Sequence, residues 1–298
     1  MKRKITILTI AFLSSMLMYA NAFAAATGRC GDSITWTLDD SGNLTLSGSG
    51  EMWNNDYGDS PFKDYEIRKA TVEYGITSIG ESAFLGCRGM TKLTLPSSVT
   101  SIGDGAFSGC TGLTELTLPN SVTSIGWNAF RGCTGLTELT LPNSVKSIGD
   151  SAFSGCSGMT ELTLPNSLTE IGKYAFRGCR GLTELTLPNS VTSIGDGAFR
   201  GCRGLTKLTL PNSVTSIGES AFYLCSGLSK ITSLAEIPPV CGSGVFDGVN
   251  KTNCKLIVPI VSVIAYKQAE VWNEFSNIKG FSGVEVTVAD KTRKIVVE

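Results

Sequence analysis

Seven cysteines recur at intervals of 23 residues through the middle of the chain, at Cys87, Cys110, Cys133, Cys156, Cys179, Cys202 and Cys225. The residues around them recur too, and residues 113–135, LTELTLPNSVTSIGWNAFRGCTG, represent the repeat. A fixed period of about 20 to 50 residues is typical of a solenoid, in which each unit buries its apolar face by stacking on its neighbours. The sequence therefore predicts one elongated body with capped ends.

Apolar residues occupy fixed places in the repeat, namely Leu113, Leu116, Leu118, Val122, Ile125, Ala129, Phe130 and Cys133. The alternation at Leu116 and Leu118 predicts a strand that ends at Pro119, because proline cannot donate to a strand ladder. A second extended piece ends at Gly126, and residues 129–133 are expected to form a single helical turn. Stacked at about 4.8 Å, the spacing of parallel strands, the leucines, phenylalanines and cysteines should form continuous internal ladders.

The repeats divide the chain into five predicted segments. These are a signal peptide at residues 1–24, an N-terminal cap with a β-hairpin at 25–66, seven 23-residue repeats at 67–227, a degenerate repeat with a C-terminal cap at 228–282, and a hairpin tail at 283–298. The caps are expected because a solenoid exposes an open apolar end that a polar surface must cover.

The C-terminal cap has two predicted elements. A short strand is expected at residues 254–258, and the apolar spacing of residues 263–278 favours a helix.

The first residues predict export. Three cations, Lys2, Arg3 and Lys4, precede an apolar run at residues 5–19, and small residues then offer cleavage after Ala22 or Ala24. The alternative, a membrane anchor, needs about 20 apolar residues, more than this run provides. No later stretch is apolar enough to span a bilayer. The sequence thus favours a secreted or cell-surface protein.

Composition argues against several kinds of activity. Without its three leading cations, the chain carries 22 basic and 26 acidic residues, a balance that argues against nucleic-acid binding. It has no histidine, which removes the commonest general base and the commonest metal ligand. We therefore predict no catalytic residue, no metal site and no cofactor.

The cysteines are interpreted as structural. Neighbours in a stacked row would have parallel Cβ vectors about 5 Å apart, longer than the roughly 3.8 Å that a disulfide requires. The seven repeat cysteines are therefore expected to be small buried apolar residues. Cys241 and Cys254 lie outside the row and could either remain free or form a disulfide across the C-terminal cap.

Two surfaces are candidates for binding a partner. The outer strand face carries a row of glutamates, Glu115, Glu138, Glu161 and Glu184. The loops on the other side vary between repeats and carry Trp127, Arg131, Tyr174, Arg177, Arg180, Arg200 and Arg203. Arginine and aromatic residues often anchor interfaces, which slightly favours the variable loops. The alternative for each surface is a solvated face with no ligand.

The pattern Cys-x-x-Leu-x-x-Leu-x-Leu-Pro-x-Ser-Val-x-x-Ile-Gly-x-x-Ala-Phe resembles the leucine-rich repeats of the BspA-like bacterial surface proteins. Residues 31–38 and 254–259 resemble the caps of that family. The resemblance implies an α/β repeat solenoid, a right-handed leucine-rich-repeat fold with a parallel strand ladder. Ser121 stands where the commoner leucine-rich consensus has asparagine or cysteine, so strong horseshoe curvature is not expected.

The resemblance also implies adhesion to host extracellular-matrix proteins such as fibronectin or fibrinogen, or to other bacteria. The chain is expected to act as a monomer. Two alternatives remain open. One is a carbohydrate-binding module that uses Trp127 and Tyr174, and the other is a structural spacer.

Overall fold

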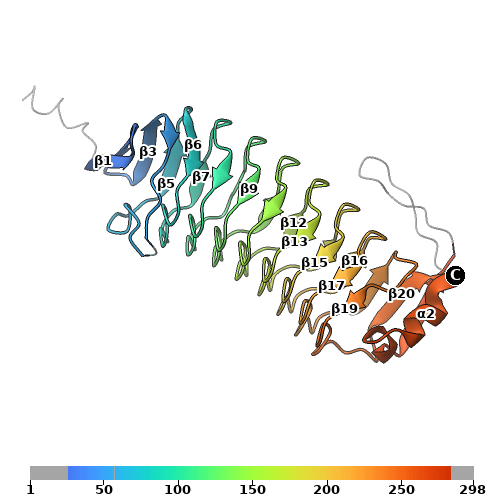
Figure 1. Cartoon of the computed structure of the whole chain (residues 1–298). Helices are drawn as coiled ribbons and strands as arrows, with labels where there is room; N and C mark the ends of the chain where they lie inside the picture. The colour runs from blue at the N-terminus through green and yellow to red at the C-terminus, as the bar shows by residue number, and fades with distance from the viewer. Residues whose placement is uncertain (1–25, 57, 283–298) are drawn as a thin grey trace, which may run out of the picture.

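The computed structural model describes residues 26–56 and 58–282. They form one elongated solenoid whose coils follow one another from the N-terminal to the C-terminal end (Figure 1). The predicted signal peptide at 1–24 and the predicted hairpin tail at 283–298 lie outside the described residues.

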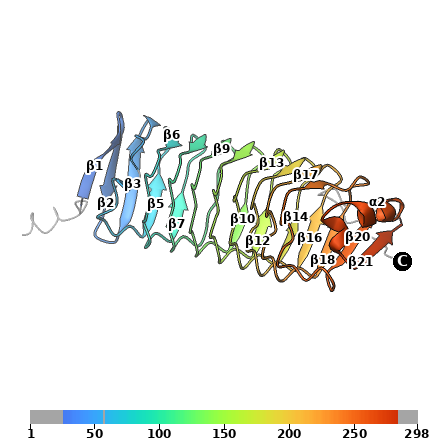
Figure 2. The same cartoon turned by 60° about the horizontal axis from the view of Figure 1, so that its bottom comes forward.

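Each regular coil contributes one short strand to a front row and one to a back row, and turning the solenoid by 60° shows the strands stacked along its length (Figure 2). The front row after the cap comprises β5 (Lys69–Val72), β7 (Lys92–Thr94), β10 (Glu138–Thr140), β12 (Glu161–Thr163), β14 (Glu184–Thr186), β16 (Lys207–Leu210), β18 (Lys230–Ser233), β20 (Lys255–Pro259) and β21 (Asn277–Phe281).

The back row comprises β4 (Gly50–Glu51), β6 (Ile76–Ile79), β8 (Ser101–Ile102), β9 (Ser124–Ile125), β11 (Ser147–Ile148), β13 (Glu170–Ile171), β15 (Ser193–Ile194), β17 (Ser216–Ile217) and β19 (Val240–Cys241). Within each sheet of these rows, neighbouring strands pair in parallel with a shift of one repeat, as Leu185 does with Leu208, and the pairing is interrupted between β7 and β10, between β12 and β14 and between β11 and β13. This confirms the predicted parallel ladder.

The segment expected to be a helical turn, Ala129–Cys133, forms a series of hydrogen-bonded turns instead. The N–H groups of Phe130 and Gly132 donate to carbonyls of the next coil, at Ala152 and Ser154. The intervening N–H groups bond within their own coil, as Cys133 does with Phe130. Because every second donor is used between coils, an α-helical pattern cannot form, and stacking is favoured over helix formation.

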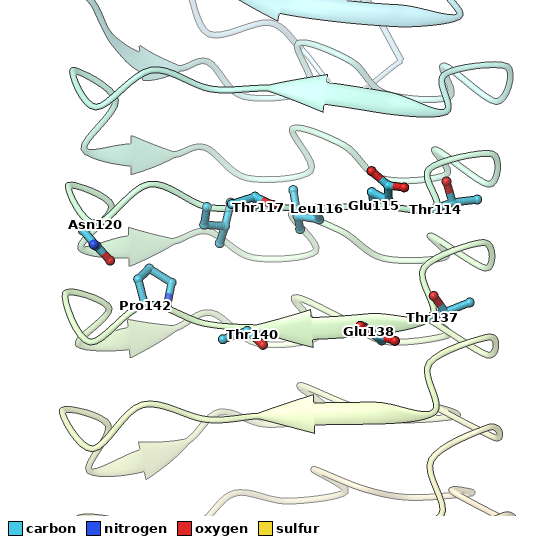
Figure 3. A pocket seen from close by; sticks show the side chains of 10 residues that line it. Thr114, Glu115, Leu116, Thr117, Asn120, Thr137, Glu138, Thr140 and Pro142 are labelled. Carbon is cyan, nitrogen blue, oxygen red and sulfur yellow. The ribbon is translucent and has the colours of Figure 1, made fainter. Parts of the chain in front are cut away.

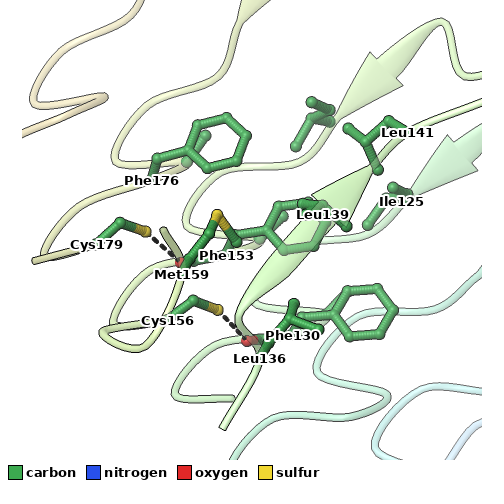
Figure 4. Packing of buried hydrophobic residues seen from close by; sticks show 14 of the residues in the cluster. Ile125, Phe130, Leu136, Leu139, Leu141, Phe153, Cys156, Met159, Phe176 and Cys179 are labelled. Carbon is green, nitrogen blue, oxygen red and sulfur yellow. Dashed lines mark hydrogen bonds between the residues drawn. The ribbon is translucent and has the colours of Figure 1, made fainter. Parts of the chain in front are cut away.

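The predicted internal ladders are present (Figure 4). The phenylalanines of adjacent coils stack, with ring centroids 5.2 Å apart between Phe130 and Phe153 and 5.5 Å between Phe153 and Phe176. The repeat cysteines are buried, as expected, and Cys110 to Cys225 have no measurable exposure. Both ladders follow from the 23-residue period, because each coil places the same residue at the same point of the core.

The N-terminal cap is an antiparallel unit of β1 (Ala26–Gly31), β2 (Ile34–Leu38) and β3 (Asn43–Gly48). The β2–β3 hairpin was predicted, and Asp39 closes its turn by accepting hydrogen bonds from the N–H groups of Ser41 and Asn43. Strand β3 then pairs in parallel with β5, which joins the cap to the front row. Trp36 and Phe62, 5.6 Å apart, extend the aromatic core into the cap.

The C-terminal cap differs from its prediction. A helix was expected over residues 263–278, but α2 (Val263–Gln268) is short and is flanked by the 3₁₀ turns η1 (Ile260–Ser262) and η2 (Trp272–Glu274). The chain then returns as β21, which pairs with β20. The early end of α2 lets Trp272 and Phe275 each pack 5.3 Å from Phe246, so that they cover the last ring of the ladder.

Candidate binding surfaces

The front face carries a row of charged side chains in which basic and acidic residues are separated along the solenoid. Strand pairing places Lys69 beside Lys92 and Glu138 beside Glu161. Towards the C-terminus, Glu184 lies beside Lys207 and forms an ion pair with it at 2.5 Å. The predicted glutamate row is therefore an acidic centre with lysines towards both ends.

The front ladder is interrupted in this acidic centre. The coil of residues 115–117 has only an isolated bridge, between Lys92 and Glu115, and no strand pairing with β10. A hollow of about 590 Å³, which we call the front hollow, lies between the two coils (Figure 3). Glu115 and Glu138 lie near one end of it, and Asn120 and Pro142 lie at the other. The hollow presents carboxylates and threonines to solvent and suits a cationic group better than an anionic one.

Threonine hydroxyls beside this face are largely committed to the fold. The hydroxyl of Thr160 donates to the carbonyl of Thr137 at 3.2 Å, and the hydroxyl of Thr206 donates to that of Thr183 at 3.0 Å. These bonds link successive coils, so the threonines contribute to stacking.

The exposed turns that precede each front strand form a second surface, which we call the turn ridge. It comprises Tyr174, Arg177, Arg180, Arg200, Arg203 and Tyr223. Arg177 and Arg200 belong to adjacent coils, whose phenylalanine rings are 5.4 Å apart. The guanidinium carbon of Arg200 lies 4.7 Å from the ring centre of Tyr223, and that of Arg177 lies 6.0 Å from Tyr174. These cation–π contacts hold the two arginines along the ridge.

The four arginines make the turn ridge positively charged. Across residues 26–56 and 58–282, no carboxylate lies within ion-pair distance of these guanidinium groups. The nearby Lys173 does have a partner, Asp196, at 3.1 Å. The hydrogen bond from Lys173 lowers the pKa of the Asp196 carboxyl. The ridge is therefore a basic patch that is available to an anionic partner.

Trp127 and Arg131 do not join the turn ridge. They share a coil that lies two repeats before Tyr174, and Trp127 is 51% exposed. Tyr223 does belong to the turn ridge, because the 23-residue period places it directly after Arg200 in the row.

Several acidic residues of the variable loops have a structural role. In alternate coils an aspartate accepts a hydrogen bond from the backbone N–H of the next coil, as Asp104 does from Trp127 at 2.7 Å and Asp150 does from Lys173 at 2.9 Å. Asp196 does the same for Glu219 at 3.0 Å. This bond involves only the backbone N–H of the donor residue and makes no demand on its side chain, which is Trp127, Lys173 or Glu219 in the three cases.

A match to the BspA type leucine rich repeat region covers residues 55–180 and 146–257, in 6 copies. The chain belongs to this family. A leucine-rich repeat protein from Bacteroides ovatus ATCC 8483 is 26% identical, with 76% of this chain and 70% of that protein covered and a TM-score of 0.53. The T. pallidum leucine-rich repeat protein is 28% identical, with 72% and 86% covered and a TM-score of 0.50. A comparison with curated proteins finds no significant match.

In this BspA-type solenoid, serine occupies the place that asparagine or cysteine has in the commoner leucine-rich consensus. The Ser98 hydroxyl donates to the carbonyl of Ile76 at 2.7 Å, and that of Ser167 donates to Val145 at 2.6 Å. Ser121 and Ser213 make the same bond, so four of these serines link coils at the corner where the chain turns from the front row to the back row. The buried hydroxyls of Ser144 and Ser190 have no such partner among the described residues.

The cysteines of the BspA-type repeats are free thiols throughout the described part of the chain. Cys241 and Cys254, the candidate disulfide, are also free, and the thiol of Cys241 lies 3.7 Å from the carbonyl oxygen of Pro239. Burial raises the pKa of Cys241 to about 12 and that of Cys254 to about 11. Such thiols remain protonated near neutral pH and are poor nucleophiles.

Neither a metal-binding cluster nor a membrane span is found within residues 26–56 and 58–282. No group of three or more metal-ligating side chains comes together there, and none of the helices has the length and apolar character needed to cross a bilayer.

Proposed function

We propose that this BspA-type chain is an exported bacterial surface protein that binds protein partners through its turn ridge and acts as an adhesin. The observation that supports this most directly is the group of four arginines that have no carboxylate partner in the described part of the chain, two of which lie against tyrosine rings. Arginine and tyrosine are enriched where protein interfaces gain most of their affinity. The proposed targets are host extracellular-matrix proteins or proteins on other bacteria, bound by a monomer.

The turn ridge is a better candidate than the front face for this role. On the front face, Glu184 already has Lys207 as a partner, and the hydroxyls of Thr160 and Thr206 beside it are bonded to backbone carbonyls. On the ridge, the guanidinium groups of Arg177, Arg180 and Arg203 are exposed. A partner that offers carboxylates could accept paired hydrogen bonds from them, a geometry that favours arginine over lysine.

Binding without catalysis is the proposed mode of action. The turn ridge and the front hollow are open surfaces. The buried thiols have raised pKa values, as for Cys133 at about 12, and so are poorly suited to act as nucleophiles. No cofactor is needed for this role.

The experiment compares binding of the mature protein to immobilised fibronectin, fibrinogen and bacterial surface extracts. The ridge variant replaces all four arginines by alanine, and a charge-matched control replaces the exposed Lys92, Lys146, Lys230 and Lys279 by alanine. We expect the ridge variant to lose at least about tenfold in affinity, as for the removal of interface anchors, and the control to bind like the unmodified chain. Equal losses in both variants would show that only net charge matters and would overturn the proposal.

A carbohydrate-binding module is the second candidate, because Trp127 is 51% exposed and Tyr174 is 38% exposed. Aromatic faces can carry a sugar with little dependence on salt, whereas an arginine-mediated protein contact weakens as salt rises. Binding on a glycan array that is lost in W127A/Y174A and is insensitive to salt would favour this candidate. A chain that binds nothing in either assay would be a structural spacer.

A further inference from the structure

A second hollow, of about 640 Å³, lies where the N-terminal cap meets the first coil. One wall is the cap segment from Phe62 to Lys69, and the other is the turn from Gly86 to Thr91. We call this hollow the junction groove. It shares no residue with the turn ridge or with the front hollow, and sequence reasoning did not identify it.

The groove exists because the cap turn is shorter than a repeat turn. Phe62 stacks on Phe84 at 4.9 Å, yet strand pairing aligns Lys69 with Lys92. The cap thus runs seven residues from its phenylalanine to its lysine, whereas the first coil runs eight. Residues 61–64 of the cap still form turns, but no cysteine precedes Cys87 in the ladder. The cap segment is one residue shorter than the coil that it covers, and the hollow lies beside it.

The walls of the groove are fixed by bonds within the fold. The buried hydroxyl of Ser60 donates to the carbonyl of Ala83 at 2.7 Å, which holds the cap segment against the first coil. The N–H of Thr91 donates to the carbonyl of Arg68 at 2.8 Å, which closes the other side. A groove held in this way needs little rearrangement to accept a ligand.

The groove combines an apolar floor with a cationic rim. Phe62, Ile67 and Cys87 are buried beneath it, and the ring of Tyr65 is 39% exposed at its edge. The charged groups that line it are Lys63, Glu66, Arg68, Lys69 and Arg88.

Most of this positive charge is free to meet a ligand. Lys63 is paired with Asp59 at 2.8 Å. In the described part of the chain, no carboxylate lies within ion-pair distance of Arg68, Lys69 or Arg88. With Glu66 as the one acidic residue in the lining, the rim is strongly cationic and calls for an anionic ligand.

We propose that the junction groove binds an acidic sugar unit, held by its carboxylate on Arg68 and Arg88 and by the apolar side of its ring on Tyr65. The volume is within the range of about 300 to 1,000 Å³ that is usual for small-molecule sites. An acidic peptide suits the groove less well, because extended peptides usually add to a free strand edge. The adjacent strands β3, β5 and β7 already pair with one another.

The test is isothermal titration calorimetry of the mature chain with trigalacturonic acid and with its methyl ester, which has no charge. We expect the acid to bind and the ester not to bind. R68Q/R88Q and Y65A should each weaken binding of the acid by at least about tenfold, since each removes a main contact. K146Q/K279Q, which removes the same charge from exposed sites elsewhere, should leave binding unchanged, and matching circular dichroism spectra would confirm that the variants are folded.

Each other result overturns the proposal. Equal binding of the acid and the ester would mean that the cations do not select the ligand. Binding of hexaglutamate but not of trigalacturonic acid would assign the groove to acidic peptides. No binding of either, by the folded chain, would mean that the groove is not an anion site. Because the arginines of the turn ridge are unchanged in these variants, the result is independent of the proposed adhesin function.

Discussion

The thiol of Cys156 donates a hydrogen bond to the carbonyl oxygen of Phe130, with the sulfur and oxygen 3.3 Å apart. The same carbonyl accepts the N–H of Cys133 in its own coil at 3.2 Å. A carbonyl oxygen has two lone pairs, so the thiol uses the one that the turn leaves free. Equivalent bonds occur from Cys110 to Cys225, so the cysteine row links the coils as well as filling the core.

Removing one of these thiols should destabilise the solenoid. C156A loses a buried hydrogen bond and leaves a small cavity, and we expect the free energy of unfolding to fall by about 1–2 kcal/mol. C156S should cost less, because its hydroxyl can still donate to the Phe130 carbonyl. Urea unfolding followed by far-ultraviolet circular dichroism measures both values. A larger loss in C156S than in C156A would show that the hydrogen bond is unimportant.

The buried thiols should also make the fold sensitive to alkali. Burial raises the pKa of Cys87 and Cys133 to about 12, from an ordinary value of 9.0. Above pH 9 the unfolded chain releases thiol protons that the folded chain keeps. The contribution of these thiols to the free energy of unfolding is therefore fully present below pH 9 and is lost as the pH rises towards 12. Each such thiol should lower the unfolding free energy by about 1.4 kcal/mol per pH unit in this window. Urea unfolding at pH 8, 9 and 10 under reducing conditions measures the slope, and a flat profile would contradict it.

Counting reactive thiols tests the state of Cys241 and Cys254. Cys241 is half-buried, whereas the other nine cysteines are buried. A thiol reagent at pH 8 should therefore react slowly with the native chain. After denaturation without reductant, it should react with ten thiols. A count of eight would indicate that the candidate Cys241–Cys254 disulfide forms.

The aromatic ladder should make a central phenylalanine important for stability. Phe153 is fully buried and stacks on Phe130 and Phe176. F153A should lower the free energy of unfolding by about 3–5 kcal/mol, because the cavity interrupts the ladder on both sides. F153L fills most of the space and should cost less. Urea unfolding measures the free energy of unfolding of both variants. Equal losses would mean that the volume of the cavity left by the substitution does not determine the loss of stability.

The parts of the fold that repeat were predictable, because a 23-residue period determines which residues align. Phe130 must stack on Phe153 once the coils are parallel, and Cys133 must be buried beside them. The ends were less predictable, since they contain the residues that do not repeat. The apolar spacing after Val263 resembles that of a helix, but packing of Trp272 and Phe275 over the last ring determines the cap.

The candidate surfaces, too, were predictable where they follow the repeat and not predictable elsewhere. Periodicity places Arg177 beside Arg200, so the core of the turn ridge could be predicted. The junction groove could not, because it depends on a turn that is one residue shorter after Phe62 and on strand pairing of Lys69. The interruption of the front ladder at Glu115 also has no signal in the repeat, whose sequence there matches its neighbours.

The aspartates that accept hydrogen bonds between coils should contribute to the stability of the solenoid. The Oδ1 of Asp150 accepts the backbone N–H of Lys173 at 2.9 Å in the next coil. D150A should cost about 1–3 kcal/mol, the usual range when a hydrogen bond to a charged group is lost. D150N keeps an acceptor oxygen and should recover part of this loss. E219A, at an exposed equivalent position whose side chain makes no such bond, should change stability by less than about 0.5 kcal/mol. Urea unfolding of the three variants decides the matter: a cost for E219A equal to that of D150A would mean that the bond between coils is not the source of the effect.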